Sequence, residues 1–77
     1  MGNRKHNTKY AKEVGRRLKV RMDEFKLTQM ELSKLTGVPQ PDISVYINGK
    51  YTPSVITVVK LARALNMSTD ELINFEV

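Results

Sequence analysis

Apolar residues recur at steps of four and three along residues 10–25, which is the spacing of one face of an α-helix. The apolar positions are Tyr10, Val14, Leu18, Met22 and Phe25. Charged residues occupy the other side of the same segment, so the pattern predicts an amphipathic helix that packs on a core through its apolar face.

A short second helix is predicted directly after this segment. Thr28 and Glu31 have the spacing of a capping box, in which each residue satisfies a free amide of the other at a helix start. Leu32 and Leu35 are expected to face inward. Gly37 is expected to end the helix, because glycine adopts the left-handed conformation at little cost.

A third helix is predicted over about residues 40–47. Pro41 is tolerated only in a first helical turn, and Asp42 there suits the helix dipole. The apolar stripe of this helix is Ile43, Tyr46 and Ile47. Asn48 and Gly49 are expected to end it.

Two more helices complete the pattern. Ser54 is the expected cap of a fourth helix, whose buried stripe is Val58, Leu61, Ala62 and Leu65. Ser68 and Glu71 form a second capping box, which opens a short fifth helix. The fold class is therefore all-α, with a compact five-helix domain over residues 9–77 that follows a flexible basic arm at residues 1–8.

Composition excludes several classes of function. The chain has 77 residues, no cysteine and a single histidine, so it has no disulfide framework, no thiolate metal site and no plausible nucleophile–base pair. We expect no enzymatic activity, no cofactor and no bound metal. No apolar run approaches the ~18 residues of a membrane span, and the N-terminus lacks the apolar region of a secretory signal. The expected location is the cytoplasm.

Positive charge is concentrated at the N-terminal end. The first 21 residues contain eight basic residues and one acidic residue, whereas acidic residues outnumber basic ones in the rest of the chain. This asymmetry suits a polyanionic partner or an anionic membrane surface, and a merely solvated basic face accounts for it equally well.

The second and third helices are separated by a short turn that contains Gly37. The small side chain of Ser33 lets the third helix approach closely, and burial of Ile43 and Tyr46 holds that helix in place. This spacing is typical of a helix-turn-helix, in which the first turn and outer face of the second helix remain exposed for insertion into a DNA major groove.

The stretch from Val14 to Phe75 resembles the helix-turn-helix family of the lambda repressor, Cro and related regulators. The resemblance rests on LTQMELS, TGVPQPDIS, the ING turn, the Pro53-Ser54 helix start and KLARALNMSTDEL, in that order. It implies sequence-specific binding of duplex DNA, with the third helix in the major groove and the second helix across it.

The resemblance also implies roles for individual residues. Gln40 matches a glutamine that opens the recognition helix and can pair bidentately with adenine. The other base-facing positions are occupied by Pro41, Ser44 and Val45. Gln29 matches a glutamine that binds a DNA phosphate and braces the recognition helix. The remaining residues expected near phosphates are Arg16, Arg17, Thr28, Asn48, Gly49, Lys50 and Ser54.

This chain departs from the family pattern at one pair of positions. Many relatives have an arginine at the position of Met22 and a glutamate at that of Ile47, and the two form an internal ion pair. Both residues are apolar here, so a hydrophobic contact is expected in place of the ion pair.

The expected function is transcriptional regulation, most simply repression, by a bacterial or phage-encoded protein at the nucleoid. Two alternatives remain open: an antitoxin that represses its own operon, and a protein-interaction module that reuses the fold. A homodimer on DNA is expected, through an apolar C-terminal end made of Leu72, Ile73, Phe75 and Val77. A toxin or an anti-repressor is a further candidate partner. The basic arm either wraps the duplex or serves solubility alone.

Overall fold

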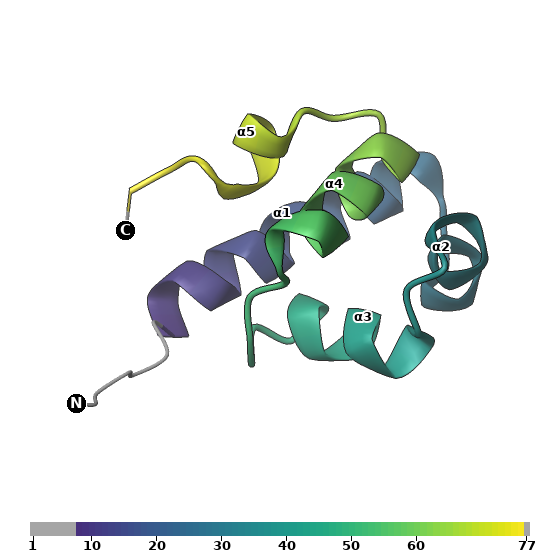
Figure 1. Cartoon of the computed structure of the whole chain (residues 1–77), viewed down its shortest axis with the longest axis horizontal. Coiled ribbons are helices and arrows are strands. Elements are labelled where there is room, and N and C mark those ends of the chain that lie inside the picture. The colour runs from purple at the N-terminus through teal and green to yellow at the C-terminus, as the bar shows by residue number, and fades with distance from the viewer. Residues whose placement is uncertain (1–7, 77) are drawn as a thin grey trace.

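The computed structural model describes residues 8–76, which form five helices and contain no strand (Figure 1). The helices are α1 (Thr8–Phe25), α2 (Gln29–Thr36), α3 (Gln40–Ile47), α4 (Val55–Ala64) and α5 (Thr69–Ile73). The predicted all-α fold is confirmed. The arm predicted for residues 1–8 lies outside the described residues, except that Thr8 is the first residue of α1.

The helix ends follow the capping residues that the sequence predicts. Thr28 caps α2 and Ser68 caps α5 through complete capping boxes, with Glu31 and Glu71 as the respective partners. The Ser54 hydroxyl accepts a hydrogen bond from the Thr57 amide at the start of α4. Gly37 ends α2 with a φ of +79°, in the left-handed region that favours glycine. Local sequence therefore determines the bounds of α2, α4 and α5.

One core connects the helices, and its largest fully buried side chains are leucines, Ile43 and Val14. Both members of the substituted family pair contribute to it: Met22 is 3% exposed, and Ile47 packs against the core. Hydrophobic side chains thus occupy the positions where many relatives have an ion pair.

Two predicted core residues are on the surface, which corrects the sequence-based expectation. Leu35 is 64% exposed because Leu32 takes the buried face of the eight-residue α2, and Leu35 lies to one side of that face. Phe25 is the last residue of α1 and is 43% exposed. The Arg21 guanidinium lies 5.3 Å from the centre of its ring.

Two glycines allow α1 to pack closely on the end of α3. A Cβ at Gly15 would lie 2.5 Å from the carbonyl oxygens of both Tyr46 and Ile47. A Cβ at Gly49, whose φ is +73°, would lie 2.8 Å from the Cα of Lys12. The orientation of α3 relative to α1 therefore depends on the absence of both side chains.

Candidate nucleic-acid interface

The N-terminal ends of α2 and α3 are joined by a hydrogen bond between two glutamines. Gln40 Nε2 donates to Gln29 Oε1 over 2.7 Å, and both residues are half-buried. Each amide group offers two N–H donors and one carbonyl acceptor. Gln40 therefore keeps its own carbonyl oxygen and one N–H, and Gln29 keeps both of its N–H groups for other partners.

The outer face of α3 presents the other residues predicted to read bases. Pro41 is exposed, and Ser44 and Val45 are half-buried. Asn48 Nδ2 lies 3.4 Å from Ser44 Oγ, which is a long hydrogen bond. The structure thus brings Gln40, Pro41, Ser44 and Val45 onto one helix surface.

The turn after α3 continues this surface into the start of α4. The Lys50 amide donates to the Val45 carbonyl, which fixes the backbone of the turn. The Lys50 side chain is exposed. The Ser54 hydroxyl donates to Thr57 Oγ1 and accepts from the Thr57 amide, so Ser54 itself is fully engaged. The amides of Val55 and Ile56 are first-turn donors that have no acceptor within a helix. They, rather than the Ser54 side chain, are the groups at this end that can bind an anion.

Tyr46 connects α3 to the first turn of α4. Burial raises the pKa of its hydroxyl, as does the negative charge of Asp42, and a hydrogen bond with Thr57 partly opposes both effects. The phenol therefore stays protonated, and it links the two elements on either side of the Asn48–Lys50 turn.

The amide and the hydroxyl of Thr28 are both engaged in its own capping box. Its amide donates to Glu31 Oε1, and its hydroxyl accepts from the Glu31 amide. The hydroxyl hydrogen is the one donor that remains for an anion at this position.

Arg16 and Arg17 are not brought together with the rest of the predicted site. Successive residues of a helix advance by about 100°, so Arg17 and the α3-facing Gly15 point to nearly opposite sides of α1. Figure 1 shows α5 and α3 on opposite sides of α1. Arg17 Nη1 donates to the Glu71 carbonyl of α5 over 2.8 Å, and its guanidinium lies 4.3 Å from the Phe75 ring centre.

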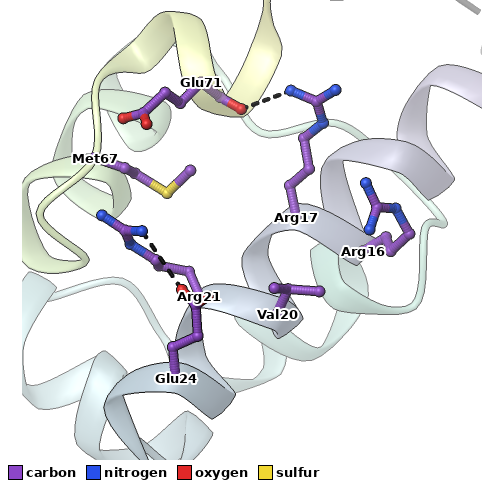
Figure 2. A pocket seen from close by; sticks show the side chains of 7 residues that line it. All are labelled: Arg16, Arg17, Val20, Arg21, Glu24, Met67 and Glu71. Atoms are coloured by element: carbon purple, nitrogen blue, oxygen red, sulfur yellow. Dashed lines mark hydrogen bonds and ion pairs between the residues drawn. The ribbon is translucent and has the colours of Figure 1, made fainter.

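Figure 2 shows Arg17 reaching the backbone of Glu71 across a hollow of about 330 Å³ between α1 and α5. Arg21 lines the same hollow and donates to the carbonyls of Leu65 and Asn66, just after α4. These arginines hold the C-terminal ends of α4 and α5 against α1, where cations satisfy free carbonyls. Arg17 therefore has a structural role in this fold, and its contact with phosphate stays a prediction.

Arg16 and Arg17 also share the carboxylate of Glu13, at 2.7 and 2.8 Å. Their hydrogen bonds, with Arg16 the larger cause, lower the pKa of Glu13 to about 2. Because the folded state lowers this pKa, the stabilisation is complete above the unfolded value of ~4.3 and is lost as the pH falls towards 2. We expect Glu13→Gln to show a shallower loss of stability than the native chain between pH 4.5 and 2, measured by urea unfolding. Equal slopes would contradict this role for Glu13.

The predicted apolar C-terminal end mostly packs against other residues of the same chain. Leu72 is fully buried, and the Phe75 ring stacks on Tyr10 with centroids 4.7 Å apart. The Tyr10 hydroxyl donates to the Ile73 carbonyl. Val77 lies outside the described residues. Leu72 is therefore not available for the expected interface, whereas Ile73 and Phe75 remain partly exposed.

Sequence analysis missed two residues that shape this surface. Lys12 is exposed and packs against Gly49, so it is the α1 cation beside the Asn48–Lys50 turn. Gly15 allows α1 to pack closely against the end of α3. A glycine inside a strongly periodic helix was the available signal, since it costs up to ~1 kcal/mol there unless a close contact requires it.

The model of the helix-turn-helix family matches residues 18–72, a span that contains α2 and α3 and the turn between them. The chain belongs to the helix-turn-helix family. Two uncharacterized HTH-type transcriptional regulators of Archaeoglobus fulgidus are each 35% identical to it. The first alignment covers 78% of this chain and 84% of the relative, and the second covers 77% and 90%.

Two solved structures have the same helix-turn-helix fold. One is the restriction-modification controller protein C.AhdI from Aeromonas hydrophila, with a TM-score of 0.77, 27% identity, and coverage of 80% of this chain and 94% of that one. The other is the P22 c2 repressor in complex with a synthetic operator, with a TM-score of 0.76, 28% identity, and coverage of 82% and 96%. This helix-turn-helix protein is a DNA-binding transcriptional regulator of the Cro/C1 type. In the described part of the chain, no helix is long and apolar enough to cross a membrane.

Proposed function

We propose that this regulator represses transcription by inserting α3 into the major groove of a specific duplex site, with α2 lying across the groove. The observation that carries the proposal is the hydrogen bond from Gln40 Nε2 to Gln29 Oε1. It orients the Gln40 amide before DNA arrives, while one N–H and the carbonyl oxygen remain available. Those two groups match N7 and N6 of adenine.

The neighbouring residues supply a reading surface with few hydrogen-bond donors. Pro41 and Val45 offer apolar contact to thymine methyl groups, and the Ser44 hydroxyl can donate or accept. Gln40 is therefore the principal source of hydrogen-bonded base discrimination. Repression is supported by the likeness to the P22 c2 repressor, whose structure contains an operator.

Phosphate contacts are assigned to the groups that surround α3. Gln29 is placed on one side, and Asn48, Gly49, Lys50 and the first amides of α4 on the other. Lys12 joins this set because it packs against the Gly49 turn. Arg16 and Arg17 are left out because other residues of the chain occupy them.

Selection of bound duplexes from a random library, using the full chain, tests this function. We expect one motif to be enriched, with adenine at the position that Gln40 reads. Enrichment of no motif from a chain that gives a folded spectrum would overturn sequence-specific binding.

We further propose that two copies occupy one site, through the uncharged segment between Lys50 and Lys60 rather than through the C-terminal end. Tyr51, Val55 and Ile56 are 62%, 72% and 70% exposed. These residues adjoin the Asn48–Lys50 turn, so an interface there would lie beside the proposed phosphate contacts. A patch of this size is small compared with the ~1,200–2,000 Å² of a stable interface, so the pair should be weak in solution and favoured on DNA.

Ile56→Lys is expected to shift sedimentation at high protein concentration towards the monomer and to weaken binding to a two-half-site duplex. Lysine carries a charge that must be desolvated in the interface. Val20→Lys, at a 43% exposed position on α1, is the control and should leave the sedimentation unchanged. If the Ile56→Lys variant associates like the native chain, this surface is not the interface.

A further inference from the structure

A groove between α2 and α4 lies outside the surface that is proposed to bind DNA. We call it the α2–α4 groove; its volume is about 350 Å³ and its lining consists of Leu35, Thr36, Lys60, Arg63 and Ala64. It lies at the C-terminal part of α2, whereas the Gln29–Gln40 bond marks the N-terminal end. Six residues of helix separate Gln29 from Leu35, a rise of about 9 Å.

The cations of this groove are unpaired, in contrast to the arginines of α1. Arg16, Arg17 and Arg21 of α1 are each within reach of a carboxylate. Within the described residues, Lys60 and Arg63 have neither an ion pair nor a hydrogen bond through their side chains, and both are exposed. No acidic residue occurs between Asp42 and Asp70 in the sequence, so α4 itself offers them no carboxylate. The groove therefore has an uncompensated positive charge.

The groove also has an apolar wall. Leu35 is 64% exposed, and Ala64 lies opposite it on α4. A phosphate backbone offers an exposed leucine nothing that water does not, whereas an aliphatic side chain from a partner would gain free energy by covering it. Positive charge beside an exposed leucine is thus better suited to a protein segment than to DNA.

We propose that the α2–α4 groove binds an acidic segment of a partner protein, with a bulky aliphatic side chain of that segment against Leu35 and its carboxylates on Lys60 and Arg63. The site is separate from the proposed DNA contacts, so the partner and the DNA can be bound together. The inference extends beyond DNA binding and does not depend on the identity of the operator.

Titration of the ¹⁵N-labelled full chain with the blocked peptide Glu-Glu-Leu-Glu-Glu-Leu-Glu-Glu, followed by NMR, tests the proposal. We expect saturable shifts at the amides of residues 34–36 and 60–64. Two control peptides, with Gln in place of each Glu or Ser in place of each Leu, should bind about tenfold more weakly. Equal binding of the Ser peptide would overturn the proposal, because it would indicate simple attraction of a polyanion.

Variants of the chain locate the binding site. Lys60→Gln/Arg63→Gln is expected to weaken peptide binding about tenfold and to leave DNA affinity equal to that of Lys9→Gln/Lys26→Gln, which removes the same charge elsewhere. Leu35→Gln should weaken the peptide alone. If the Lys60/Arg63 variant instead loses more DNA affinity than its matched control, the groove is a DNA contact and the proposal is wrong. Shifts spread over α1, or no saturable shift, would overturn it as well.

Discussion

Gly15→Ala is expected to lower the free energy of unfolding by about 1–3 kcal/mol, which is the usual cost of forcing extra atoms into a packed contact. The new Cβ would lie 2.5 Å from two carbonyl oxygens at the end of α3, and backbone atoms cannot rotate away as a side chain can. A 77-residue domain has roughly 4–11 kcal/mol of stability in total. The substitution would therefore remove a large part of it.

The sign of this change is the decisive measurement. Helix propensity alone predicts that alanine at a helical glycine stabilises by about 0.5–1 kcal/mol, the opposite result. Urea unfolding followed by circular dichroism distinguishes the two. Val20→Ala, at an exposed position of the same helix, is the control and should stay within about 0.5 kcal/mol of the native chain. A Gly15→Ala protein more stable than the native one would contradict the close packing of α1 on α3.

Gln40→Ala is expected to weaken binding to the selected site by about 1–3 kcal/mol and to relax the preference at one base pair. The physical reason is that the alanine cannot donate to adenine N7 or accept from N6. The measurement is a set of affinities for the selected duplex and for duplexes changed at each single position.

Two further variants distinguish base reading by Gln40 from the positioning of its amide by Gln29 and from the attraction of Lys12 to phosphate. Gln29→Ala removes the acceptor of the Gln40 amide, so part of its effect should disappear when Gln40 is already alanine. Lys12→Gln should weaken all duplexes alike and reduce the salt dependence by about one charge per subunit. If Gln40→Ala also weakens every duplex equally, Gln40 does not read a base.

Most of the helical framework could be predicted because its causes are local. Thr28 with Glu31, and Ser68 with Glu71, form bonds within one turn, so four residues of sequence are enough to place a helix start. The left-handed Gly37 and the order of the two short helices follow in the same way, and they place Gln29 and Gln40 at neighbouring helix ends. Those features determined the fold class and the likeness to helix-turn-helix regulators.

Contacts between residues far apart in the sequence could not be predicted in this way. Arg17 is exposed and basic in the sequence pattern, yet its guanidinium binds a carbonyl 54 residues away. The apolar C-terminal end is expected from the sequence to form an interface, but its Phe75 ring stacks on Tyr10 of α1, 65 residues earlier in the chain. The spacing of Leu35 predicts a core position, but Leu32 takes the buried face of the short α2 and Leu35 lies to one side of it.

The sequence by itself therefore determined the capped starts of α2, α4 and α5, which helices form the helix-turn-helix, and which glutamines lie at its exposed end. The tertiary structure alone decided which arginines are engaged: Arg16, Arg17 and Arg21 of α1 bind carboxylates or carbonyls, whereas Arg63 of α4 binds neither, and nor does its neighbour Lys60. It also decided how closely α1 meets α3. The physical reason is range, because capping and periodicity act within a few residues, whereas ion pairing and close packing depend on chain segments that only folding brings together.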